Sequence, residues 1–331
     1  MLPNASKMRI ISPVDSLAEA PRLLAAGADE LYGGFVPPEW QDSFELLASI
    51  NQRTFAAAQI ASEAELAEII RLAHAAGRTF ALTLNAPYYS DAQLPLLLAY
   101  LDRMVALGID GLILADLGLL RLLPGRYPEL ELHASTLAHL SNSAALRFYA
   151  SHGIRRAVLP RHLTIAEMAA LAAAVPEVRC DAFLLVGKCP NTEGLCTFQH
   201  VSPERIWPCE IPYRIAPVSD SPSPALQAAM QRQASWAHTD RRHGCGLCAI
   251  PWLQRAGICG LKLVGRGAPP ALKESNILLV CEFLALAGEA TDFSAYRRRA
   301  MAAHWARFGA ECHPNICYYP ELMVQDPLGE E

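Results

Sequence analysis

Short runs of almost continuous hydrophobic residues alternate along the chain with longer stretches in which alanine and leucine recur at helical spacing. The short runs, which predict β-strands, are MRIIS (8–12), DELYGG (29–34), RTFALTLN (78–85), DGLILAD (110–116), LELHAS (130–135), RRAVLP (155–160), DAFLLVG (181–187) and GLKLVG (260–265). Because these runs are continuous rather than alternating, they indicate parallel strands buried on both faces.

Helices are predicted between these runs. They include SLAEAPRLLAAG (16–27), SEAELAEIIRLAHAAG (62–77), DAQLPLLLAYLDRMVALG (91–108), NSAALRFYASHG (142–153) and TIAEMAALAAAV (164–175). Several begin near Ser, Thr or Asp and end at Gly, which are the residues preferred at helix caps. The repeated strand–helix pattern predicts an α/β fold, a TIM-like (β/α)8 barrel, for which about 250 residues are typical. A doubly wound open sheet is the alternative that periodicity leaves open.

One long segment interrupts the repeat after the seventh predicted strand. Residues 188–247 are rich in proline and polar residues, and they hold Cys189, Cys196 and Cys209. A loop of this length inside a compact domain usually has a function. We therefore expect a barrel domain over residues 8–290 that includes this cysteine-bearing insertion, followed by a C-terminal helix and a cysteine-bearing tail over residues 291–331.

The composition is that of a globular protein, with 52% hydrophobic and 18% charged residues. Polar residues interrupt every apolar run before it could cross a membrane, and the first residues do not resemble a secretory signal, so we expect a cytoplasmic protein. Ten cysteines are then unlikely to be disulfide-bonded, which leaves metal, redox chemistry or burial. A net charge of −5 makes nucleic acid less favoured as a partner than a small molecule.

Active sites of (β/α)8 barrels lie at the C-terminal ends of the strands. Polar residues that follow the predicted strands are therefore candidates for the site, although strand ends are also where ordinary polar loops begin. The predicted catalytic residues are Asn85, Asp116, His133 and Glu193, and the predicted substrate-binding cations are Arg161, Lys188 and Arg266. A guanidinium group suits a carboxylate because it donates two parallel hydrogen bonds.

The cysteine spacing leaves two metal chemistries open. Only Cys245 and Cys248 have the close spacing of a structural zinc site. Six residues separate Cys189 from Cys196, twelve separate Cys196 from Cys209, and thirty-eight lie between Cys209 and Cys248. Four such thiolates are compatible with an iron–sulfur cluster, which tolerates varied spacing. The remaining pair, Cys312 and Cys317, fits either a second set of ligands or simple packing.

The arrangement of Cys189, Gly194 and Cys196, preceded by Asp181 and Phe183, resembles the signature of the collagenase-like peptidases, peptidase family U32. The likeness extends over residues 83–123, 134–164 and 248–266. Two positions depart from the family pattern, because Asp181 replaces a Glu and Val186 replaces a Gly.

This resemblance implies a TIM-like barrel with an oxygen-sensitive 4Fe-4S cluster on Cys189, Cys196, Cys209 and Cys248. It also implies hydroxylation of aromatic rings or RNA bases without O2, with prephenate as the oxygen donor. The chain is most similar to the branch that acts in O2-independent ubiquinone hydroxylation, which implies a heterodimer with a related cluster protein.

The main prediction is therefore an iron–sulfur-dependent hydroxylase, an oxidoreductase that acts on a small aromatic substrate resembling a ubiquinone precursor. Three alternatives remain: an RNA-base hydroxylase of the same family, a peptidase, and a non-catalytic scaffold or sensor that carries a cluster. Proteolysis is disfavoured because the sequence contains neither HExxH nor GxSxG.

Overall fold

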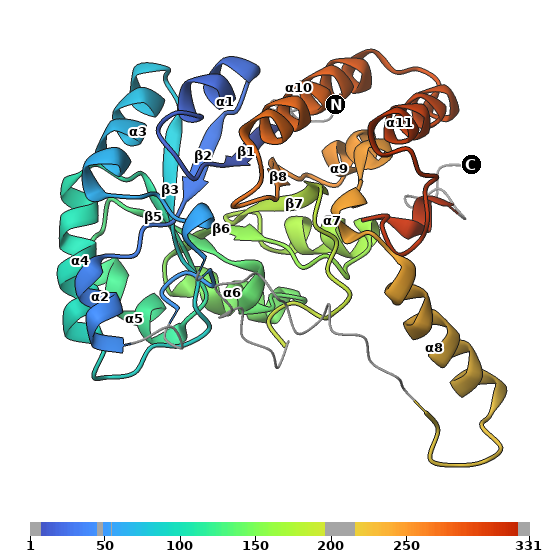
Figure 1. Ribbon diagram of the computed structural model, residues 1–331, viewed down its shortest axis with the longest axis horizontal. Helices are drawn as coiled ribbons and strands as arrows, with labels where there is room; N and C mark the ends of the chain where they lie inside the picture. Colours follow the sequence, from blue (N-terminus) through green and yellow to red (C-terminus); the bar gives the residue numbers. More distant parts are fainter. Residues whose placement is uncertain (1–7, 45–48, 54, 196–215, 324–331) are drawn as a thin grey trace.

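All eight predicted strands form, and they close into a parallel barrel in the computed structural model (Figure 1). The structure describes residues 8–44, 49–53, 55–195 and 216–323. The strands are β1 (Arg9–Pro13), β2 (Glu30–Gly33), β3 (Thr79–Leu84), β4 (Gly111–Leu114), β5 (Glu131–Ala134), β6 (Ile154–Val158), β7 (Arg179–Leu185) and β8 (Gly260–Leu263). Each pairs with the next, and β8 pairs with β1, so the open-sheet alternative is excluded.

Helices cover the outside of the barrel (Figure 1). They are α1 (Ala20–Ala26), α2 (Pro38–Phe44), α3 (Glu63–Ala75), α4 (Leu94–Ala106), α5 (Leu117–Arg126), α6 (Ser143–Ser151), α7 (Ile165–Ala174), α9 (Ile250–Arg255) and α10 (Pro270–Glu289). Side chains of Ser62, Asn142 and Thr164 cap the backbone N–H groups at the starts of α3, α6 and α7, as their sequences predict.

Buried side chains fill two regions, one between the strands and the surrounding helices and one inside the barrel. Between strands and helices lies a large apolar core, whereas four residues, Ile11, Tyr32, Ala81 and Ile113, form a small apolar cluster of their own. Charged side chains occupy further inward-facing positions of the strands, for example Glu30, two residues before Tyr32 on β2. Arg156 from β6 bonds Glu30 of β2 and Asp181 of β7, each at 2.6 Å, and all three are at most 3% exposed.

Two elements lie outside the barrel. Helix α11 (Phe293–Phe308) confirms the predicted C-terminal helix and packs beside α10. Helix α8 (Pro224–Ser235), within the insertion after β7, projects away from the barrel in Figure 1. The sequence did not predict α8. None of its residues is buried, and it lies in the Pro-rich insertion, outside the strand–helix repeat on which the other predictions depend. The division of the chain at residue 290 stays a prediction.

Candidate functional site

Two predicted site residues, Arg161 and Glu193, meet at the end of the barrel where the strands terminate. Arg161 follows β6, and its guanidinium group forms an ion pair with the Glu193 carboxylate. The backbone N–H of Arg161 also donates to Glu193 Oε2 at 2.8 Å. The two side chains are only 11% and 5% exposed, so the pair is largely shielded from water.

Aromatic rings surround this ion pair. The Arg161 guanidinium carbon lies 3.7 Å from the centre of the Phe183 ring and 5.8 Å from that of Tyr318. The two rings stack on each other with an interplanar angle of 10°. A cation over an aromatic face is held by the charge distribution of the ring, and more strongly where water is excluded. Arg161, Phe183 and Tyr318, which we call the Arg161 stack, therefore place a guanidinium plane and two aromatic rings beside the Glu193 carboxylate.

The loop that carries Glu193 is fixed against the loop after β5. His139 contacts the Glu193 carbonyl oxygen through Nδ1 at 2.9 Å, and Thr136 Oγ1 donates to Glu193 Oε2 at 3.2 Å. Gly194 allows this approach, because a Cβ there would stand 2.7 Å from the Leu137 carbonyl oxygen. The Glu193 carboxylate is thus positioned by chain segments far apart in sequence.

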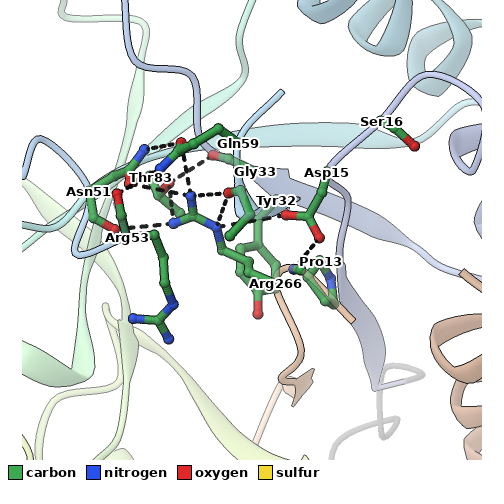
Figure 2. A network of polar contacts seen from close by, with 12 residues as sticks. Pro13, Asp15, Ser16, Tyr32, Gly33, Asn51, Arg53, Gln59, Thr83 and Arg266 are labelled. Carbon is green, nitrogen blue, oxygen red and sulfur yellow. Dashed lines mark hydrogen bonds and ion pairs between the residues drawn. The ribbon is translucent and has the colours of Figure 1, made fainter. Parts of the chain in front are cut away.

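Arg266, predicted to bind substrate, instead points into a network of protein acceptors (Figure 2). Its Nε and Nη2 donate to the Ala58 carbonyl, at 3.1 and 2.6 Å, and its Nη1 donates to the Asn51 carbonyl and to Thr83 Oγ1. A second Nη2 contact reaches Asn51 Oδ1 at 3.3 Å. Every N–H direction of this guanidinium therefore has a protein partner. In this arrangement Arg266 holds the loop after β2 in place.

Further cations lie close to this network. Arg53 belongs to the loop that Arg266 holds, and burial together with the charge of Arg161 lowers the pKa of Arg53. Lys188 Nζ lies 5.2 Å from the centre of the Tyr318 ring, and burial followed by the charge of Arg161 lowers the pKa of Lys188 to about 8. We call Arg53, Arg161 and Lys188 the rim cations, and their charges interact, because Arg161 lowers the pKa of each of the other two.

The remaining predicted catalytic residues are dispersed. Asn85 is half-buried after β3, and its Oδ1 has no hydrogen-bond partner among the described residues. Asp116 accepts a hydrogen bond from the Leu119 N–H as the N-cap of α5. His133 lies inside β5 rather than beyond it, is 3% exposed, and approaches Glu131 at 3.3 Å. His133 therefore joins the charged interior of the barrel.

Sequence reasoning missed several residues of this region. Tyr318 comes from the C-terminal tail, and Arg53 and Asn51 come from a loop without a distinctive pattern. Arg156, Glu30 and Asp181 occupy strand interiors, where charges are rarely expected. A signal for the last group was present, because a charge inside an otherwise apolar strand of a barrel must be paired when it is buried.

Lys262 also lies inside the barrel, with Nζ 3.8 Å from the centre of the Tyr32 ring. Burial lowers its pKa from the ordinary value of 10.5 to about 8. Between these values the unfolded chain holds a proton that the folded chain has lost, so the free energy of unfolding should rise with pH. The rise should be on the order of 3 kcal/mol.

We expect Lys262→Met to remove most of this rise while preserving the packing of the side-chain stem. Denaturant unfolding of both proteins between pH 7 and the pKa of a free lysine tests the prediction. Parallel pH curves for the two proteins would show that Lys262 titrates as an ordinary lysine.

The predicted cluster ligands fall in different places. Cys196 and Cys209 lie outside the described residues, and Cys189 is partly buried after β7. Cys248 lines a cavity together with Cys245, Cys312 and Cys317. As they stand, no three of the described His, Cys, Asp and Glu side chains are placed to hold a single metal ion. The set of Cys189, Cys196, Cys209 and Cys248 stays a prediction.

Comparison with known proteins identifies the family. Residues 15–307 match peptidase family U32, and the chain belongs to this family. The solved structure of the U32 peptidase Mk0906 has a TM-score of 0.50 at 15% identity, over 81% of this chain and 97% of that one, and supports the shared fold.

Three curated relatives carry names that describe RNA modification. The tRNA hydroxylation protein P of Escherichia coli is 29% identical over 57% of this chain and 39% of its own length. The protein of the same name in Haemophilus influenzae is 28% identical over 57% of this chain and 38% of its own length. The 23S rRNA 5-hydroxycytidine synthase of Escherichia coli is 25% identical over 65% of this chain and 31% of its own length. The chain thus spans about two fifths or less of each relative.

A separate observation concerns membranes. None of the helices in the described part of the chain combines the length and the hydrophobicity that crossing a bilayer requires.

Proposed function

We propose that this chain is a hydroxylase that acts on a nucleobase of RNA. Family membership and the names of the curated relatives support the reaction and the substrate class. A ubiquinone precursor was the main substrate predicted from the resemblance, and nucleic acid was less favoured. The names of the relatives favour RNA instead, so we now propose RNA as the main substrate and a ubiquinone precursor as the alternative.

The observation that carries the proposal is the Arg161 stack beside the Glu193 carboxylate. An enzyme that modifies a base must accommodate it outside the helical stack, commonly between aromatic or guanidinium planes. The stacked arrangement of Arg161 on Phe183, with Tyr318 beside it, offers such planes. The low exposure of Arg161 and Glu193 would strengthen polar contacts between these groups and a base edge.

We propose two polar groups at this end of the barrel for orienting the base. Asn85 directly follows β3, at the same end of the barrel as Arg161, and its Oδ1 has no hydrogen-bond partner among the described residues. An amide or carboxylate oxygen accepts from the exocyclic amino group of cytosine or adenine. The carboxylate of Glu193, held by Arg161 and Thr136, is the second hydrogen-bond acceptor of this kind.

We propose that the rim cations attract and bind the negatively charged groups of the substrates. RNA brings phosphates, and the overall charge of −5 makes a local positive region necessary for their approach. Hydroxylation without O2 also requires an oxygen donor, for which the resemblance implies prephenate, a dicarboxylate. Buried carboxylates need cationic partners, and Arg161 and Lys188 are the residues that we propose for this role.

Nucleoside analysis of cells tests the substrate class. Transfer RNA and ribosomal RNA are purified separately from a strain lacking the gene and from the same strain carrying it on a plasmid, then digested and analysed by mass spectrometry. We expect one nucleoside to lose the mass of one oxygen atom in the deletion strain and to regain it on complementation.

Two outcomes would contradict the proposal. Identical nucleosides in both strains, together with a loss of hydroxylated quinone precursors, would return the substrate to a small aromatic molecule. Identical nucleosides and quinones would favour the scaffold or the peptidase instead. The heterodimer with a related cluster protein stays a prediction that co-purification from these strains can examine.

A further inference from the structure

Helix α11 buries one side and exposes the other. The buried side consists of residues four positions apart, each at most 4% exposed, namely Tyr296, Ala300 and His304. Arg298, Met301 and Trp305 lie on the opposite side, where they follow one another at spacings of three and four residues. Met301 is 42% and Trp305 57% exposed, and the Arg298 side chain is 70% exposed. We call Arg298, Met301 and Trp305 the α11 face.

The charge of α11 is unbalanced. Its sequence, FSAYRRRAMAAHWARF, contains four arginines and no acidic residue, although the whole chain has a net charge of −5. Three of these arginines are consecutive, at positions 297–299, and no carboxylate lies three or four residues away from them within the helix. Pairing within the helix therefore does not explain this concentration of arginine, whereas an anionic partner would.

Acidic side chains near these arginines contact them only at long range. Arg298 Nη2 lies 3.9 Å from Asp292 Oδ2, and Arg299 Nη2 lies 3.9 Å from Glu282 Oε1. This separation is too long for a hydrogen bond, and all four side chains are more than half exposed. Such ion pairs contribute little, because water and salt screen them. Both guanidinium groups can therefore exchange these contacts for a phosphate, which accepts two parallel hydrogen bonds from arginine.

We propose that the α11 face binds the RNA substrate away from the modified base, with Arg298 and Arg299 on phosphates and Trp305 stacked on an unpaired base. This inference rests on the proposed RNA substrate. Proteins that hold single-stranded nucleic acid combine cations along its backbone with aromatic rings on which bases stack, and an exposed tryptophan beside arginines supplies both. The consecutive arginines favour RNA over a protein surface, because RNA provides a regular row of negative charges.

A short segment joins α11 to the candidate site. The His243 ring stacks on Phe308 at the end of α11, with ring centres 4.9 Å apart, and the Arg241 carbonyl accepts a hydrogen bond from the backbone N–H of Lys188 at 3.0 Å. Between them, Arg242 is 87% exposed and forms an ion pair with Asp240. These contacts place the end of α11 beside the loop that carries Lys188, as is required if one RNA molecule contacts both.

Binding of labelled transfer RNA from the deletion strain, measured by fluorescence anisotropy at several salt concentrations, tests this surface. The chain is purified whole and without oxygen as wild type, Arg298→Gln, Trp305→Ala and Trp305→Phe. Arg71→Gln, on α3 across the barrel in Figure 1, and Phe148→Ala are matched controls, since Arg71 is 62% and Phe148 50% exposed. Circular dichroism confirms that each variant is folded.

The two kinds of contact predict different losses. Arg298→Gln should weaken binding and reduce the slope of the logarithm of the affinity against the logarithm of the salt concentration by about 0.7–0.9. Trp305→Ala should weaken binding about 5-fold or more without changing this slope, and Trp305→Phe should retain most of the affinity because it keeps a ring. Both controls should bind as the wild type does.

Unchanged affinity in both Arg298→Gln and Trp305→Ala, from a wild type that binds and hydroxylates RNA, would overturn the α11 face and leave the proposed function intact. The same unchanged affinity with loss of a stable protein complex on size-exclusion chromatography would show that the face binds a protein instead. An equal loss in Arg71→Gln would indicate a general effect of charge and would also overturn the proposal. A wild type that binds no RNA would overturn both this surface and the proposed function.

Discussion

Replacing Arg156 by methionine is expected to lower the free energy of unfolding by about 3–5 kcal/mol, because it leaves two buried carboxylates without their cation. Glu30 and Asp181 each bond this guanidinium at 2.6 Å and are at most 3% exposed. Denaturant unfolding at neutral pH measures the loss. Arg156→Lys is the matched control, since it keeps the charge but cannot bond both carboxylates through a planar fork.

The pH dependence separates this mechanism from a simple packing defect. Burial alone would raise the pKa of Glu30, but the charge of Arg156 lowers it below the ordinary value. In the wild type this carboxyl stabilises the fold above its unfolded pKa, and the contribution disappears as the pH falls through the folded pKa. In Arg156→Met burial acts unopposed by that cation, so the destabilisation should shrink in acid. An equal loss at all pH values would indicate a cavity instead.

Arg161→Ala is expected to reduce hydroxylation about 100-fold or more, as for loss of a preorganised charged donor. Arg161 pairs with Glu193 and lies on the Phe183 ring, and no other described cation lies on that ring. The rate is measured as hydroxylated product per chain. Arg161→Lys should retain part of the activity because it keeps the charge and loses the planar face.

Iron content and melting temperature of the same preparations supply the controls for Arg161. Both variants should keep the metal content of the wild type, because the predicted cluster ligands are cysteines and Arg161 is not among them. Unchanged activity with a clear drop in melting temperature would mean that Arg161 only ties Glu193 to the barrel. That role is structural and would remove Arg161 from the site.

The barrel was predictable because its strands have the continuous apolar pattern of parallel strands. Each predicted run overlaps an observed strand, and RTFALTLN corresponds to β3 (Thr79–Leu84). Helix α8 was not predicted by the same means, because PALQAAMQRQAS lies in the Pro-rich insertion outside the strand–helix repeat and buries no residue. A helix that packs on a core needs an apolar face, which gives the sequence a helical period. An exposed helix has no such requirement.

The sequence predicted at which end of the barrel the site lies, but it did not predict which residues contact one another there. The strand-end rule led to Arg161 and Asn85, which lie at the expected end of the barrel. It also led to Arg266, whose donors are taken by Asn51 and Ala58, residues more than two hundred positions earlier. Pairing between segments so far apart leaves no local trace in a single sequence.

The cysteines show the same limit. Spacing suggested that Cys312 and Cys317 were either ligands or packing residues, and it could not place them beside Cys245 and Cys248. That neighbourhood depends on the path of α11, which returns the tail to the barrel (Figure 1). Only the assembled fold brings both pairs to one cavity.

Reconstitution with purified components tests the proposed function most directly. Wild-type chain and Arg161→Ala, both loaded with metal, are incubated without oxygen with RNA from the deletion strain and with prephenate as the donor. The proposal predicts that one nucleoside gains the mass of one oxygen atom with the wild type and not with the variant. RNA left unchanged by metal-loaded wild type, while a quinone precursor in the same mixture becomes hydroxylated, would contradict it.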